Sequence, residues 1–122
     1  MDRLLYWLCI VQGSYFFLTG LWPIVHVRSF MAVTGPKHDV WLVKTVGALV
    51  TVIGVAIVAA GLRRSGATPE LLVVAIGGAF VLMMVDVVYV LRRVIAPIYL
   101  ADAAAEALLL GSWAVLLLGG GA

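Results

Sequence analysis

Charged side chains are scarce in this 122-residue chain, in which Asp, Glu, Lys and Arg together make up 11% of the residues. An ordinary soluble domain carries about 25% charged residues, which form much of the polar surface that faces water. The few charges here gather in short clusters between long apolar runs, and hydrophobic residues reach 65% of the sequence. The composition therefore excludes an ordinary soluble domain and predicts an integral membrane protein.

Cysteine is almost absent, because Cys9 is the one cysteine of the chain and lies inside the first apolar run. A lone thiol forms neither an internal disulfide nor a CxxC redox pair, which disfavours a thiol oxidoreductase. We interpret Cys9 as a small buried apolar side chain.

Motifs for metals, phosphates and nucleic acids are also missing. His26, His38 and Asp39 match no strong zinc spacing. The sequence contains no Gly-rich phosphate loop, no HExxH and no GxSxG. The net charge of +2 is small, and no basic stripe alternates with aromatic residues. We therefore expect no metal, no cofactor, no catalytic residue and no nucleic-acid partner.

Four apolar runs occupy most of the chain, at 4–22, 40–62, 69–91 and 97–118. About 18 apolar residues are enough to cross the roughly 30 Å hydrocarbon core as a helix. We predict an all-α integral membrane protein whose four transmembrane helices form an up-down antiparallel bundle, as one domain over residues 1–122. Residues 23–39 mix apolar and polar side chains, which is typical of a connection lying in the membrane interface.

The expected helix ends carry recognisable signals. Asp39 is a suitable N-cap for the second span, and Thr68 followed by Pro69 and Glu70 is a strong start for the third. Because successive spans alternate in direction, the connection 23–39 lies at the same end of the molecule as the turn after the third span. We call this the charged end, since most polar side chains are near it.

Three ionisable residues lie deeper than the interface. Counting about 1.5 Å per residue, Lys44 is roughly 6 Å inside the second span, Asp86 roughly 7 Å inside the third and Glu106 roughly 13 Å inside the fourth. A charge in the apolar layer costs several kcal/mol, so carboxylates at these depths should face other helices. Asp102 and Glu106 are four residues apart and share one helix face.

Two interpretations of these residues stay open. The first is a structural ion-pair network, in which Lys44 neutralises the acids and Arg93 is the next candidate. The second is a water-reachable pocket near the charged end for a ligand, ion or proton. Its predicted lining is drawn from all four spans: Gln12, Lys44, Asp86, Tyr89, Arg93, Asp102 and Glu106.

Helix packing is predicted from small residues and from polar residues on one face. On the first span, Gln12 shares a face with Tyr15, Thr19 and Trp22, which predicts that Gln12 points inward and makes an interhelical hydrogen bond. Trp113 lies too deep for an interfacial tryptophan, so we expect a protein partner for it. Close packing is expected at the following positions: Gly47, Thr51, Gly54, Gly77, Gly78 and Gly111.

The leading functional hypothesis is a small non-enzymatic membrane protein, a possible transporter, that binds or passes a small ligand or ion. The alternatives are an accessory subunit of a larger membrane complex and a membrane enzyme that acts on a lipid-like substrate. Small-residue faces favour a homo-oligomer or a partner membrane protein, in addition to the membrane lipids.

Orientation follows from the cations near helix ends. Five are expected at the charged end and three at the other: Arg28, Lys37, Lys44, Arg92 and Arg93 against Arg3, Arg63 and Arg64. The positive-inside rule then places the charged end in the cytoplasm and both termini outside. The architecture is typical of small proteins of the bacterial inner membrane.

Overall fold

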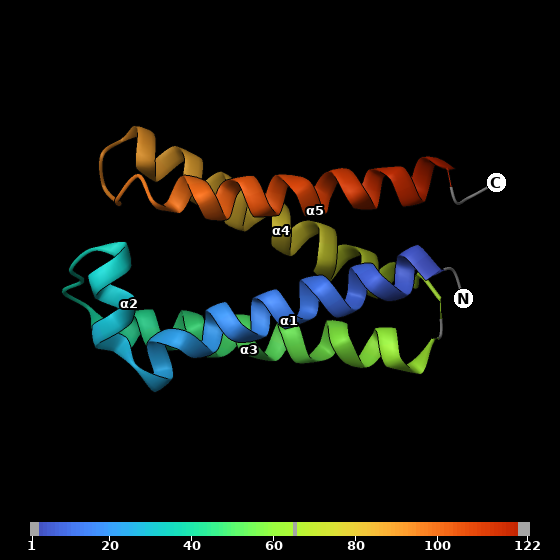
Figure 1. The fold of residues 1–122 in the computed structure, drawn as a ribbon, viewed down its shortest axis with the longest axis horizontal. Helices are drawn as coiled ribbons and strands as arrows, with labels where there is room; N and C mark the ends of the chain where they lie inside the picture. Colours follow the sequence, from blue (N-terminus) through green and yellow to red (C-terminus); the bar gives the residue numbers. More distant parts are fainter. Residues whose placement is uncertain (1–2, 65, 120–122) are drawn as a thin grey trace.

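The computed structural model describes residues 3–64 and 66–119, which are helical apart from their connecting turns. Five helices follow one another in this part of the chain (Figure 1). They are α1 (Arg3–Val25), α2 (Val27–Thr34), α3 (Val40–Arg63), α4 (Pro69–Leu91) and α5 (Tyr99–Gly119).

Four of the helices are long and apolar enough to cross a membrane. The shortest, α5, has 21 residues and is therefore about 32 Å long, which matches the hydrocarbon core. Mean hydropathy of the spanning windows runs from 1.5 in α1 to 2.6 in α4. The predicted all-α membrane protein with four spans is confirmed.

The spanning helices are arranged as two pairs. Helix α1 packs along α3, and α4 packs along α5, whereas contacts between the pairs are much sparser (Figure 1). Successive spans reverse direction, so α2 and the turn between α4 and α5 lie at one end of the molecule. The charged end is therefore a real end of the fold, and its cytoplasmic orientation stays a prediction.

In the α1–α3 pair, glycines that repeat every seven residues bring the two helix backbones into direct contact. A Cβ atom built on Gly54 would lie 2.6 Å from the carbonyl oxygen of Gly13, and one built on Gly20 would lie 2.5 Å from that of Gly47. Thr51 lies in the same interface, where its Oγ1 would be 2.7 Å from a Cβ on Gly20. Such spacing lets two helices approach more closely than any side chain allows.

The other predicted packing glycines lie differently. A Cβ atom on Gly77 or Gly111 would meet nothing within 4 Å, and one on Gly78 would contact only the ring of Phe16. Gly77 and Gly111 therefore contribute no close helix approach inside this chain. Packing at these two positions against another chain stays a prediction.

Two helix ends differ from the sequence-based boundaries. Helix α1 continues through Pro23 to Val25, because proline in a last turn removes a single hydrogen bond and here its ring is buried. Helix α5 starts at Tyr99, after a turn in which the Tyr99 nitrogen donates to the Ala96 carbonyl at 3.1 Å.

The predicted caps have different outcomes. The Thr68 hydroxyl accepts a hydrogen bond from the Leu71 nitrogen at 3.2 Å, so this cap is confirmed. Asp39 occupies the N-cap position of α3, but its side chain makes no capping hydrogen bond.

The connection between α1 and α3 contains the short helix α2. Trp22 folds back on it, with its Nε1 donating to Ser29 Oγ at 2.8 Å and its ring edge against Phe30. Lys37 closes the far end of α2 by donating to the Thr34 carbonyl at 3.1 Å, and its ammonium lies 5.3 Å from the centre of the Tyr99 ring. Aromatic rings and a lysine thus tie the connection to the start of α5.

We predict that Gly54→Ala destabilises the protein whereas Gly77→Ala does not. The new methyl group at Gly54 would meet backbone atoms of α1, and overpacking of this kind costs about 1–3 kcal/mol. The measurement is unfolding by denaturing detergent in mixed micelles, followed by circular dichroism. Equal stability of the two variants would contradict the glycine contact.

Candidate functional site

Gln12 joins the two helix pairs near the middle of the molecule. Its side chain is fully buried. Its Nε2 donates to the carbonyl oxygen of Ala75 on α4 at 2.7 Å, and its Oε1 accepts from Trp113 Nε1 on α5 at 2.7 Å. One amide from α1 therefore binds both helices of the other pair, and the expected partner for Trp113 is found.

Two carboxyl groups are buried in the same space between the pairs, nearer the charged end. Glu106 of α5 has no exposed surface, and Asp86 of α4 is 6% exposed. Asp102, one turn before Glu106, is half-buried. The three acids are close enough for their charges to interact, and Asp86 lies within hydrogen-bonding reach of Asp102.

Tyr15 reaches this cluster from α1. Its hydroxyl group donates a hydrogen bond to Asp102 Oδ1 of α5, which makes a second polar link between the pairs. Tyr15 was absent from the predicted pocket, although it lies on the same face as Gln12. The spacing of three residues between them is the signal that would have found it.

We call Tyr15, Asp86, Asp102 and Glu106 the acidic site. Its decisive feature is that Asp86 Oδ2 and both carboxyl oxygens of Glu106 are buried with no hydrogen-bond partner among the described residues. Buried polar atoms in proteins are nearly always paired, and carboxyl groups in hydrocarbon are especially costly when alone. The acidic site therefore lacks hydrogen-bond partners from the described part of the chain at Asp86 Oδ2 and at Glu106.

The structure does not bring the predicted cations to the acids. Lys44 is exposed on α3, and Arg93 is exposed in the turn after α4 with a φ of 60°. Neither donates to the unpartnered oxygens of Asp86 and Glu106. The expected neutralisation by Lys44, with Arg93 next, is therefore wrong, since α3 packs mainly on α1 and both side chains are exposed.

Tyr89 is not buried with the acids of the acidic site. Its side chain is 40% exposed although it shares a helix with Asp86. Of the predicted pocket residues, the structure brings together Asp86, Asp102 and Glu106, with Gln12 on the neighbouring part of the same interface.

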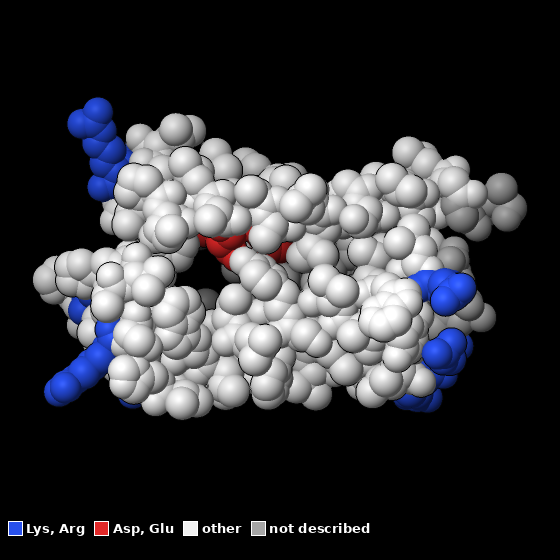
Figure 2. Space-filling view, viewed as in Figure 1, with Lys and Arg blue, Asp and Glu red and all other residues white. Residues whose placement is uncertain are grey.

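The surface view agrees with this separation of charges. Figure 2 shows acidic side chains at a hollow between the two helix pairs, while Lys and Arg side chains lie at the two ends of the molecule. Some acidic atoms are visible from outside at this hollow.

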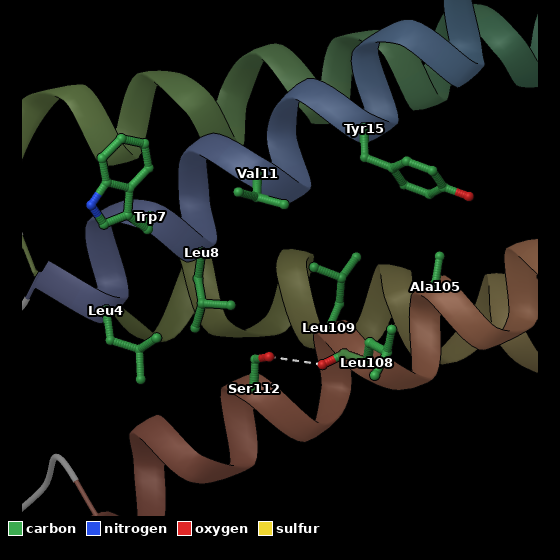
Figure 3. Close-up of a pocket in the computed structure, with 9 residues that line it drawn as sticks. All are labelled: Leu4, Trp7, Leu8, Val11, Tyr15, Ala105, Leu108, Leu109 and Ser112. Carbon is green, nitrogen blue, oxygen red and sulfur yellow. Dashed lines mark hydrogen bonds between the residues drawn. The ribbon is translucent and has the colours of Figure 1, made fainter.

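A groove between α1 and α5 has Tyr15 of the acidic site in its lining. Its volume is about 380 Å³, which is within the usual range of roughly 300–1,000 Å³ for small-molecule sites. Leu4 and Ser112 lie at one end, and Tyr15 and Ala105 at the other (Figure 3). The lining is almost entirely apolar and consists of Leu4, Trp7, Leu8, Val11, Tyr15, Ala105, Leu108, Leu109 and Ser112.

The acids do not converge as metal ligands do. Within residues 3–64 and 66–119, no group of three His, Cys, Asp or Glu side chains is placed to hold a metal ion.

No protein-family model, curated protein or solved structure matches the chain. The interpretation of the site consequently depends on its geometry alone.

We predict that Gln12→Leu and Trp113→Phe each destabilise the protein by about 1–2 kcal/mol, because each leaves a buried polar partner unpaired. The double variant should cost less than the two single variants together, with a coupling of about 0.5–2 kcal/mol. Detergent unfolding of all four proteins measures this coupling.

Ser112→Ala is the matched control on α5, because its hydroxyl bonds only to the Leu108 carbonyl of its own helix. Strict additivity of the Gln12 and Trp113 variants would contradict the direct hydrogen bond between them.

Proposed function

We propose that the protein binds a cation inside the membrane at the acidic site, in exchange for protons. The observation that carries this proposal is that Asp86 Oδ2 and both carboxyl oxygens of Glu106 are buried without a hydrogen-bond partner among the described residues. A bound cation would supply the missing partner.

The exchange of protons for a cation follows from the charge balance of the buried carboxyl groups. Carboxyl groups surrounded by hydrocarbon must be neutralised, either by protons or by cations. The described part of the chain offers the Tyr15 hydroxyl to Asp102 and no Lys or Arg to the unpartnered oxygens. Protons therefore neutralise the empty site, and each monovalent cation that enters displaces one proton from a carboxyl group.

The hypothesis of a structural ion-pair network accounts less well for these contacts. A network that fixes helix neighbours needs a cation from the chain beside each buried acid. Here the helix neighbours are specified instead by Gln12 and by the glycines between α1 and α3. The buried acids are not needed for these helix contacts, which supports a ligand as their partner.

The other two hypotheses have weaker support. An accessory subunit would use lipid-facing small residues such as Gly77 and Gly111, which have open space beside them in this chain. A lipid-modifying enzyme would use the same carboxyl groups. Neither hypothesis explains why the oxygens of Glu106 are buried without partners.

The test is proton release from the purified protein in weakly buffered detergent solution. Sodium, potassium, methylammonium and octylammonium chlorides are added in turn, and a pH-sensitive dye reports released protons. At least one cation should release protons and saturate. Glu106→Gln and Asp86→Asn should each weaken its binding by about 30-fold or more, because each removes a buried charge partner.

Glu70→Gln is the matched control, since Glu70 is an exposed acid in the first turn of α4. It should release protons as the unmodified protein does. Absence of release with all four cations, or equal release from folded Glu106→Gln protein, would overturn the proposal.

A further inference from the structure

The groove between α1 and α5 is longer than a small cation at the acidic site would need, and it is open on its outer side. It follows α1 from Leu4 to Tyr15, which is about 16 Å along the helix axis. Several of its side chains are also turned outward, including Val11 at 54% and Leu108 at 75% exposure. Because both helices span the membrane, the groove opens toward the lipid.

The groove and the acidic site share Tyr15. Tyr15 lines the end of the groove and at the same time donates its hydroxyl hydrogen to Asp102. Ala105 and Leu109 line the groove on α5 and flank Glu106, whose carboxyl oxygens are unpartnered. The apolar groove therefore ends at the tyrosine that binds Asp102, and the acidic site that Tyr15 belongs to contains carboxyl oxygens without a hydrogen-bond partner among the described residues.

From this juxtaposition we infer that the occupant is an amphiphilic amine, a molecule with one ammonium group and an alkyl tail, which enters sideways from the bilayer. The ammonium group complements the carboxyl groups of Asp86 and Glu106, and the tail lies along the groove toward Leu4. This inference rests on the proposed function, because it names the class of cation that the acidic site takes.

The alternatives fit less of the groove. A bare sodium or potassium ion would use the acids but leave the apolar channel without a role. The acyl chain of an ordinary phospholipid would fill the channel but bring no positive group to Glu106. An alkylammonium ion matches both parts, since ammonium donates up to three hydrogen bonds to carboxylate oxygens.

The experiment compares octylammonium with methylammonium, which shares the ammonium group but lacks the tail. Val11→Phe and Ser112→Phe fill the groove from opposite helices at positions away from the acids. Binding is measured by proton release from the protein in lipid nanodiscs. Partition of octylammonium into the lipid is the same for every variant, so it cancels from the comparison.

Each groove-filling variant should weaken octylammonium binding by about tenfold or more and leave methylammonium binding unchanged. Val73→Phe is the control, because Val73 is an exposed side chain of α4 outside the groove. It should bind both amines as the unmodified protein does.

The outcomes separate this inference from the proposed function. Unchanged octylammonium binding in both groove variants would overturn the inference and leave cation binding at the acids intact. An equal loss of octylammonium and methylammonium binding in the groove variants would also overturn the inference. Failure of both amines with the unmodified protein, while sodium or potassium still releases protons, would also overturn the inference alone. Failure of every cation would overturn the proposed function as well.

Discussion

The side-chain amide of Gln12 is the interaction on which the arrangement of the four spans depends. In hydrocarbon, apolar faces have no solvent-driven reason to prefer each other over lipid, so polar contacts and close fit decide which helices meet. The glycines settle this within the α1–α3 pair, but the two pairs touch sparsely. Gln12 bonds to Ala75 of α4 and Trp113 of α5 at once, and thereby sets the distance across the gap.

Much of the fold was predictable because the thickness of the hydrocarbon core dictates it. The spans at 40–62 and 69–91 agree with α3 and α4 within one residue, since charges and Thr68 mark their ends sharply. The inward face of α1 was predictable too, because a glutamine cannot face lipid without cost. Its second hydrogen bond was not, because a single sequence does not say how many helices meet at that point.

The candidate site was only half predictable, for a reason that Lys44 makes clear. Depth along a helix follows from counting residues, so the burial of Asp86 and Glu106 could be inferred. Which helix a face meets depends on packing between distant segments. Gly47 and Gly54, which follow Lys44 on α3, pack against α1, and the Lys44 side chain itself is exposed. The lysine therefore lies at the expected depth but does not reach the acids.

The sparse contact between the pairs accounts for both the gap and the unpartnered acids. A close approach of α1 to α5, like that of α1 to α3, would close the groove and bring backbone against Glu106. Tyr15 is instead long enough to span the gap and satisfy Asp102, while Asp86 Oδ2 and Glu106 stay without partners. The same gap thus keeps the helix pairs apart and leaves these carboxyl oxygens without a partner among the described residues.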